Sequence, residues 1–250
     1  MTRISYTLQI EKAHIIKNLK EHILFLQGYK RSSDESIRIN LGPINNSFPN
    51  ECFSLASTHE FIVEREEDSS ATKGFICHII SELMKRNGIC IWINSFENVF
   101  PPALKLFGID PDKIVFIHVK RQKEILWVLE EALKCDGLAA VIGEIAEINF
   151  TETRRLQLAV EKSRVTGFIV RNKPRNINIT ACVSRWKISH IPSELKNNLP
   201  GVGFPRWNIE LLKIRNGKPG SWKMEYANGL LHVAGKKEEL IALIQKKKTA

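Results

Sequence analysis

The order of apolar and polar positions begins with an amphipathic helix, which the sequence predicts over residues 10–26. Its apolar side chains recur at helical spacing with lysines between them. They are Ile15, Ile16, Leu19, Ile23 and Leu26. A polar break follows at residues 28–36, and the stretch 39–51 is so rich in Asn, Pro and Gly that we expect a loop or a linker there.

Short apolar runs then alternate with amphipathic stretches. Five runs are continuous and rich in branched residues, as buried strands are. They span residues 60–64, 88–95, 113–119, 138–144 and 166–170. Between them lie helical stretches at 71–87, 101–108, 121–135 and 151–163. This repetition predicts an α/β fold, with a mostly parallel sheet flanked by helices.

The pattern changes after Val170. Residues 176–191 alternate with a period of two, and residues 206–226 predict a β-hairpin that turns at 216–220. The last stretch, 236–250, predicts a short basic helix. We therefore expect an N-terminal helix and linker over 1–50, an α/β core over 51–190, and a β-hairpin extension with a basic helix over 191–250.

Composition narrows the class of protein. With 250 residues, of which 43% are hydrophobic, the chain can bury one substantial core. No apolar run approaches the ~20 residues of a membrane helix, and the first residues do not resemble a secretory signal, so a cytoplasmic protein is expected. The five cysteines and seven histidines show no metal-ligand spacing, and we expect the thiols to be reduced and buried.

The net charge of +10 is unevenly placed along the chain. Residues 1–150 carry 17 Lys and Arg against 20 Asp and Glu, whereas residues 151–250 carry 20 against 7. The second part therefore either meets something acidic, such as nucleic acid or a protein surface, or is a solvated basic face.

Residues 63–80, VEREEDSSATKGFICHII, have the rhythm of a phosphate-binding loop: a strand, a small-residue turn with one lysine, then a helix. A working loop, GxxxxGK[ST], needs its glycines so that backbone N–H groups can converge on the phosphates. Here Glu67 and Thr72 replace the glycines and Gly74 replaces the Ser/Thr, so that only Lys73 is retained. The sequence thus indicates a degenerate loop.

Acidic residues make this loop still less suited to a polyphosphate. Glu66, Glu67 and Asp68 would repel the anion and satisfy the dipole of the following helix themselves. We expect Asp68 or Ser69 simply to cap that helix.

A nucleotide site also needs an acid at the end of a later strand, to hold magnesium or a water. The run 138–144 ends in Gly143-Glu144, so an aspartate is missing there, although Glu144 could serve as the acid or pair with a neighbouring arginine. An unorthodox ATPase that uses Lys73 and Glu144 stays open as an alternative.

Several side chains are candidate contacts for a partner or for DNA. They are Lys120, Arg121, Lys123, Arg154, Arg155, Arg185, Arg206, Leu240, Ile241 and Ile244. Lys120, Arg121 and Lys123 cluster at a strand end. Arg154 and Arg155 open a helix, where cations suit the helix dipole poorly. Leu240, Ile241 and Ile244 form an apolar stripe. A solvated surface or a frayed tail is the alternative in each case.

Three tryptophans bear on these candidates. Trp186 and Trp207 alternate with Arg185 and Arg206, a pattern that can stack single-stranded bases. We interpret it instead as the inner and outer faces of strands. Trp127 is predicted to lie in the core.

The order of elements resembles the core of RecA. HEFIVE (59–64), the degenerate loop, ICIWINSFENVFPPALKLFGIDPDKIVFIHV (89–119), RQKEILWVLEEAL (121–133) and LAAVIGEIAEI (138–148) follow one another as in that protein. The RecA catalytic glutamate falls on Phe96, or on Glu97 if the alignment slips by one, and the second-motif aspartate falls on Gly143.

More specific segments resemble the ImuA family. They are LWVLEEAL (126–133), VIGEI (141–145), TRRLQLAVEKS (153–163), SRWKISHIPS (184–193) and PGVGFPRWNIELLKIRNGKPGSW (200–222). The resemblance implies a non-catalytic, RecA-like adaptor without a cofactor, which acts in DNA-damage-induced mutagenic translesion synthesis. It implies binding to ImuB, an inactive relative of the Y-family polymerases. RecA is a further candidate partner, as is an error-prone C-family polymerase through the assembly.

Two other classes of protein remain open at this point. The basic second part of the chain suits a single-stranded DNA-binding protein, and SulA-like division inhibitors share the degenerate core.

Overall fold

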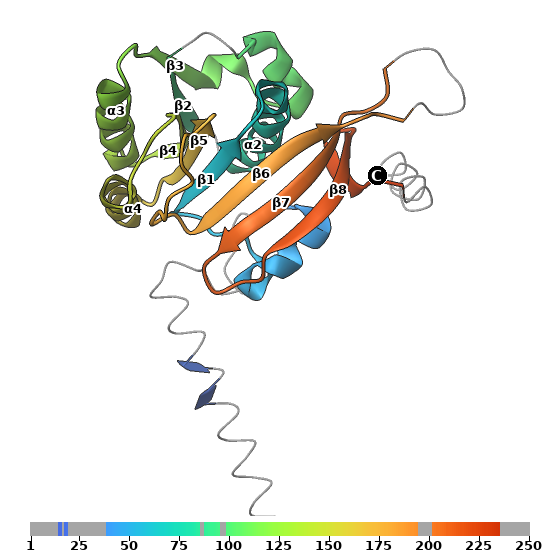
Figure 1. The fold of residues 1–250 in the computed structure, drawn as a ribbon, viewed down its shortest axis with the longest axis horizontal. Coiled ribbons are helices and arrows are strands. Elements are labelled where there is room, and N and C mark those ends of the chain that lie inside the picture. Colours follow the sequence, from blue (N-terminus) through green and yellow to red (C-terminus); the bar gives the residue numbers. More distant parts are fainter. Residues whose placement is uncertain are drawn as a thin grey trace, which may run out of the picture.

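The computed structural model describes residues 15–16, 18–19, 39–85, 88–95, 99–194 and 202–235. Within them the chain forms a sheet of nine strands in the order β3-β2-β4-β5-β1-β6-β7-β8-β9 (Figure 1). The strands are β1 (Thr58–Val63), β2 (Ile89–Asn94), β3 (Ile114–His118), β4 (Leu138–Glu144), β5 (Thr166–Asn172), β6 (Ser184–Ile191), β7 (Arg206–Ile214), β8 (Gly220–Ala227) and β9 (Leu230–Val233). Taken in this order across the sheet, β3, β2, β4, β5, β1 and β6 run parallel to one another. From β6 onward, each strand runs antiparallel to the next: β6, β7, β8 and β9.

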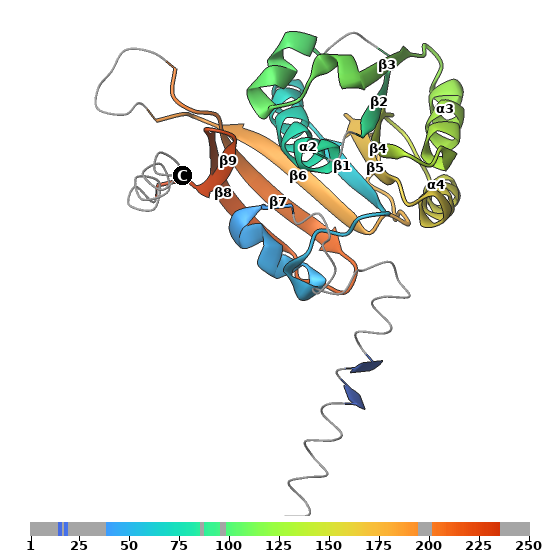
Figure 2. The same cartoon turned by 180° about the vertical axis from the view of Figure 1, so that it is seen from behind.

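Helices cover both faces of the parallel part. α3 (Gln122–Lys134) and α4 (Phe150–Ser163) lie on one face, and α2 (Ser69–Met84) lies on the other (Figure 1, Figure 2). In β5, Phe168 and Val170 join the apolar cluster beneath α2, while Ile169 joins the cluster beneath α3 and α4. Burial on both sides explains why these strands read as continuous apolar runs.

The antiparallel strands extend the sheet past α3 and α4, and their apolar side chains line the face that carries α2. Trp186, Trp207 and Met224 all belong to the α2-side cluster. Two 3-10 helices, η1 (Gly42–Ser47) and η2 (Pro49–Glu51), lie on the same face (Figure 2), and Ile44 and Phe48 pack into that cluster. The stretch 39–51 was expected to be a loop or linker, but it is part of the packed core because its apolar side chains are buried.

The predicted α/β class is confirmed, with corrections to individual elements. The short helix expected at 101–108 is present as the 3-10 helix η4 (Pro101–Phe107). Only Ser184–Ile191 of the alternating stretch 176–191 is a strand, and the edge strand β9 was not foreseen. Of the predicted helix 10–26, residues 15–16 and 18–19 are described and helical, whereas the stretch 236–250 lies outside the described residues.

All five cysteines are free, as expected, but they are not all buried. Cys77, Cys90 and Cys182 are buried and Cys135 is exposed. None of the helices in the described ranges is long and apolar enough to cross a membrane.

Candidate functional site: the acidic loop before α2 and the adjoining groove

The chain enters α2 from β1 through a short acidic loop that includes the 3-10 helix η3 (Glu66–Asp68). Asp68 lies at the N-cap position, yet its side chain makes no capping hydrogen bond. It accepts hydrogen bonds instead from Arg65 Nε at 2.8 Å and from the backbone N–H of His190 at 3.0 Å. The expected capping role of Asp68 is therefore wrong, because the carboxylate ties the loop to β6.

Hydrogen bonds from Arg65 and His190 compensate for the burial of the Asp68 carboxylate. Asp68 is only 3% exposed. Burial by itself would raise the pKa of this carboxyl, but the hydrogen bonds from Arg65 and His190 outweigh that effect and hold the pKa below its ordinary value. The other two loop acids are exposed and paired, Glu66 with Lys173 at 2.8 Å and Glu67 with Arg65 at 2.9 Å.

Lys73, at the lysine position of the loop motif, is paired with a carboxylate of the protein. Its Nζ lies 3.4 Å from Glu144 Oε1, and both side chains are almost fully buried. Glu144 also accepts hydrogen bonds from Trp92 Nε1 at 2.9 Å and from Asn172 Nδ2 at 3.0 Å. Burial lowers the pKa of Lys73 below its ordinary value, and Glu144 offsets part of this shift. α2, β2, β4 and β5 thus each contribute one side chain to a polar cluster beside the groove.

Gly143 and Gly74, at two of the positions where this chain departs from the nucleotide motifs, are required for packing. A Cβ at Gly143 would lie 2.7 Å from Leu129 Cδ2, so that position faces α3, away from Lys73. A Cβ at Gly74 would lie 2.9 Å from Trp207 Cζ2 and 3.3 Å from Phe107 Cζ. Side chains that could bind magnesium do not fit at either position unless their neighbours move.

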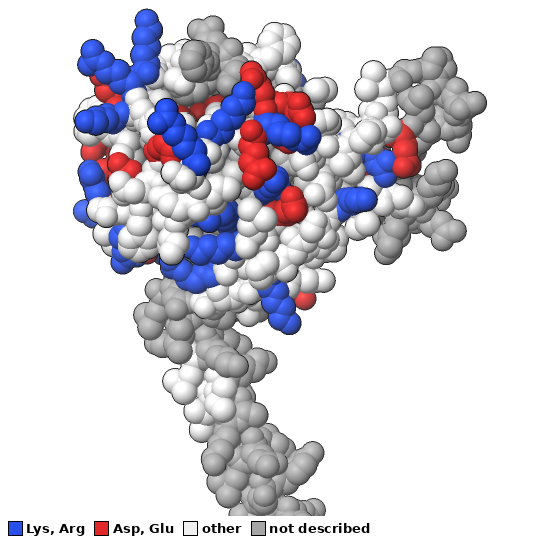
Figure 3. All heavy atoms as spheres, viewed as in Figure 1, with Lys and Arg blue, Asp and Glu red and all other residues white. Residues whose placement is uncertain are grey.

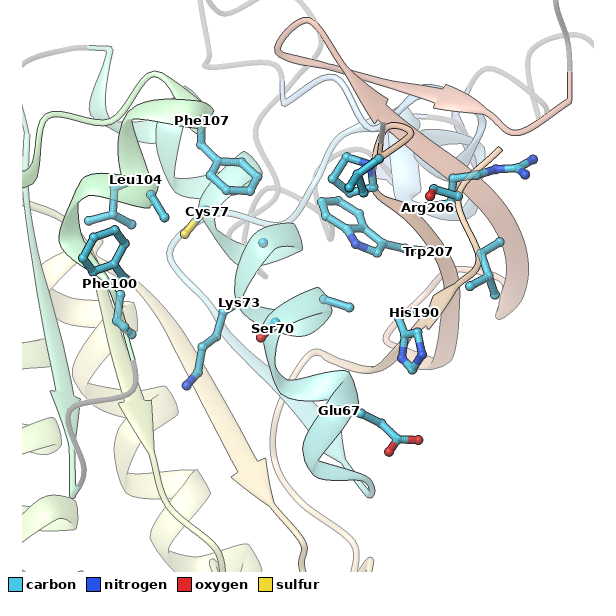
Figure 4. A pocket seen from close by; sticks show the side chains of 18 of the residues that line it. Glu67, Ser70, Lys73, Cys77, Phe100, Leu104, Phe107, His190, Arg206 and Trp207 are labelled. Atoms are coloured by element: carbon cyan, nitrogen blue, oxygen red, sulfur yellow. The ribbon is translucent and has the colours of Figure 1, made fainter. Parts of the chain in front are cut away.

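A groove of about 620 Å³ opens beside the loop, between α2, η4 and the ends of β6 and β7 (Figure 4). Leu104 and Phe107 of η4 line it together with Phe100, which directly precedes η4, and Trp207 lines it from β7. Sequence reasoning missed this groove because its walls come from segments far apart in the chain. The motif residues Glu67, Lys73 and Gly74 also line it.

Arg185 and Arg206, both candidate contacts, are held by carboxylates of the protein itself. Arg185 Nε lies 2.7 Å from Glu60 Oε2, and Glu60 is fully buried and also paired with Arg171 at 2.9 Å. Arg206 lies 2.6 Å from Glu194. Trp186 and Trp207 are 0% and 4% exposed, which confirms that they belong to the inner faces of their strands.

The remaining described candidates lie on the surface of α3 and α4. Lys and Arg side chains gather around the start of α3, at the upper left of Figure 3, where Lys120, Arg121 and Lys123 are exposed. Arg155 pairs with Glu130 of α3, and Arg154 lies 3.9 Å from Glu161. The apolar stripe Leu240, Ile241 and Ile244, like Phe96 and Glu97, lies outside the described residues.

Trp127 is not a core residue as predicted. Its side chain is 64% exposed on the outer side of α3, whereas Ile125, Leu129 and Leu133 form the buried side.

The strand order, the entry into α2 from β1 and the strand-end acid that faces Lys73 define a RecA-like α/β domain. A curated relative named "Protein ImuA", from Caulobacter vibrioides, is 31% identical over 194 residues, which cover 73% of this chain and 80% of the relative. The same protein from a second strain of that organism matches equally well. The chain belongs to the ImuA family. No family model matches it.

Proposed function

We propose that this chain is a non-catalytic, RecA-like adaptor in DNA-damage-induced mutagenic translesion synthesis. It binds an ImuB-like inactive polymerase relative, and through that assembly it serves an error-prone C-family polymerase. RecA is its second proposed partner. Membership of the ImuA family supports a role in the ImuA/ImuB mutagenesis system. The polar cluster around Lys73 supports the non-catalytic part of the proposal.

The Lys73–Glu144 ion pair is the observation that carries the proposal. A lysine that binds phosphate must be free to meet an anion, but here a buried carboxylate already neutralises it at 3.4 Å. To bind a nucleotide, the chain would have to break this pair and leave Glu144 buried beside a polyphosphate. The cost of an unpaired buried charge, several kcal/mol, opposes that exchange.

A basic surface at the start of α3 is the contact we propose for the partner. Lys120 and Lys123 are exposed, and Trp127 follows Lys123 one helical turn later. Exposed tryptophans are typical anchors of protein interfaces, and positive charges around such an anchor attract an acidic partner surface. We therefore assign this surface to an acidic face of the ImuB-like protein.

Co-purification with the ImuB-like protein and RecA of the same genome tests the function. The wild-type chain is expected to retain the ImuB-like protein, and the double variant Lys120→Glu/Lys123→Glu to lose it. A matched variant, Lys218→Glu/Lys223→Glu, reverses the same charge at exposed positions of the hairpin and should bind normally. Failure of the wild-type chain to retain either partner would contradict the adaptor function, while equal loss in both variants would contradict the α3 contact.

A further inference from the structure

The groove beside α2 has apolar walls that face an open volume. Phe100 is 71% exposed at its η4 side, and Val202 is 95% exposed at its other side. Its volume of about 620 Å³ is comparable to that of ligand pockets in proteins, which run from ~300 to ~1,000 Å³. Apolar surface of this kind is stabilised when another apolar group covers it.

The described part of the chain ends close to this groove. Tyr226 of β8 stacks on two of its walls, with ring centroids 4.9 Å from Phe107 and 5.7 Å from Trp207. Tyr226 pairs with Leu231 of β9, the last strand, and the described chain stops at Gly235 soon afterwards. The described chain therefore ends about two strand spacings, or ~10 Å, from the strand that carries Trp207.

The composition of the segment 236–250 suits the groove. Leu240, Ile241 and Ile244 are spaced so that one turn of helix would place them on one side. The five residue-to-residue steps from Gly235 to Leu240 can span up to ~17 Å, enough to reach Trp207. Five lysines and two glutamates give the segment a net charge of +3.

The charge at one rim of the groove is complementary. Glu67 lines the groove and its side chain is 58% exposed. The stretch 64–68 carries four carboxylates and one arginine. The lysines that flank the apolar stripe would be attracted to the carboxylates of this rim.

We propose that the segment 236–250 docks in this groove of its own chain. Leu240, Ile241 and Ile244 cover the aromatic walls, and the flanking lysines meet the acidic loop at the start of α2. The apolar stripe is then held in cis in the free protein, and a partner that uses the stripe or the groove must first displace it. This goes beyond the adaptor function and can be tested without any partner.

A labelled peptide of residues 236–250 tests the proposal by fluorescence anisotropy against two full-length proteins. In the double variant Leu240→Asp/Ile244→Asp the chain's own segment no longer docks, so the peptide should bind. Wild type should bind it at least tenfold more weakly, because a tethered segment competes at an effective concentration on the order of mM. Equal binding by the two proteins, or no binding by the double variant, would overturn the proposal.

A groove-filling change locates the binding site. Ser70 is exposed and lines the groove, so Ser70→Trp added to the double variant should abolish peptide binding. Ser221→Trp, which adds the same side chain at an exposed position of β8, should leave binding unchanged. Binding that survives Ser70→Trp would overturn the assignment to this groove. A dimer in the wild type that Leu240→Asp/Ile244→Asp dissolves would show exchange between two copies and overturn docking in cis.

Discussion

Single residues decide what the start of α2 can bind. Lys73 stands where the phosphate-loop pattern has its lysine, but Glu144 pairs with it, and Trp92 and Asn172 donate hydrogen bonds to Glu144. Sequence alone could indicate that Lys73 and Glu144 are the two candidates for chemistry. It could not indicate that they neutralise each other, because they come from different elements 71 positions apart.

Gly143 provides a test of packing at this scale. Gly143→Ala should cost about 1–3 kcal/mol in the free energy of unfolding, because the new Cβ meets the fully buried Leu129 at 2.7 Å. Denaturant titration measures the loss. In a Leu129→Ala background the same change should cost much less, since the obstructing methyl groups are gone. An equal cost in both backgrounds would show that this contact is not the cause.

His59 predicts how stability depends on pH. Burial lowers the pKa of His59 to about 4, although its hydrogen bond to Ser54 O partly opposes this. In the unfolded chain the pKa is ~6.5, so the unfolded state binds an extra proton between pH 6.5 and 4. Stability conferred by neutral His59 is therefore present above pH ~6.5 and is lost as the pH falls towards 4, by about 3 kcal/mol.

Denaturant titrations at pH 7, 5.5 and 4 check this. His59→Gln should remove that part of the pH dependence, whereas His118→Gln, at an exposed position, should keep it. A wild-type-like loss of stability on acidification in His59→Gln would contradict the assignment.

At the scale of elements, periodicity predicted the parallel core well and one helix face badly. Continuous apolar runs indicated β1 to β5 because those strands are buried on both sides. Trp127 was placed in the core because it stands among apolar neighbours in sequence. It lies two residues after Ile125, about 200° around the helix, and so on the opposite side of α3.

Trp127→Ser should separate stability from binding. We expect the free energy of unfolding to change by less than about 0.5 kcal/mol, because the side chain is 64% exposed. Retention of the ImuB-like protein should fall several-fold if α3 presents the contact surface. Leu158→Ser, on the exposed side of α4, is the matched control and should bind normally. Full retention by Trp127→Ser would remove α3 from the interface.

The whole molecule joins parts that no local pattern connects. Phe100 and Phe107 of the stretch 99–107, α2 and Trp207 meet only because the sheet continues through β6 and β7 past the parallel core. The buried partner of Arg185, Glu60, is 125 positions away in the chain, so the charge pattern alone suggested a contact surface where the protein has an internal ion pair. The sequence thus predicted the architecture. It could not predict which charged side chains form ion pairs within the protein, because their partners lie far away along the chain.

Nucleotide binding is the most direct test of the central claim, that Glu144 pairs with Lys73 at the start of α2 and leaves this lysine unavailable to a phosphate. Titration of magnesium-ATP into the full chain, followed by calorimetry, should give no heat of binding at micromolar to low-millimolar concentrations. Lys73→Ala should behave in the same way. Micromolar binding that Lys73→Ala abolishes would contradict the claim and make the chain an ATP-binding protein that uses Lys73 and Glu144.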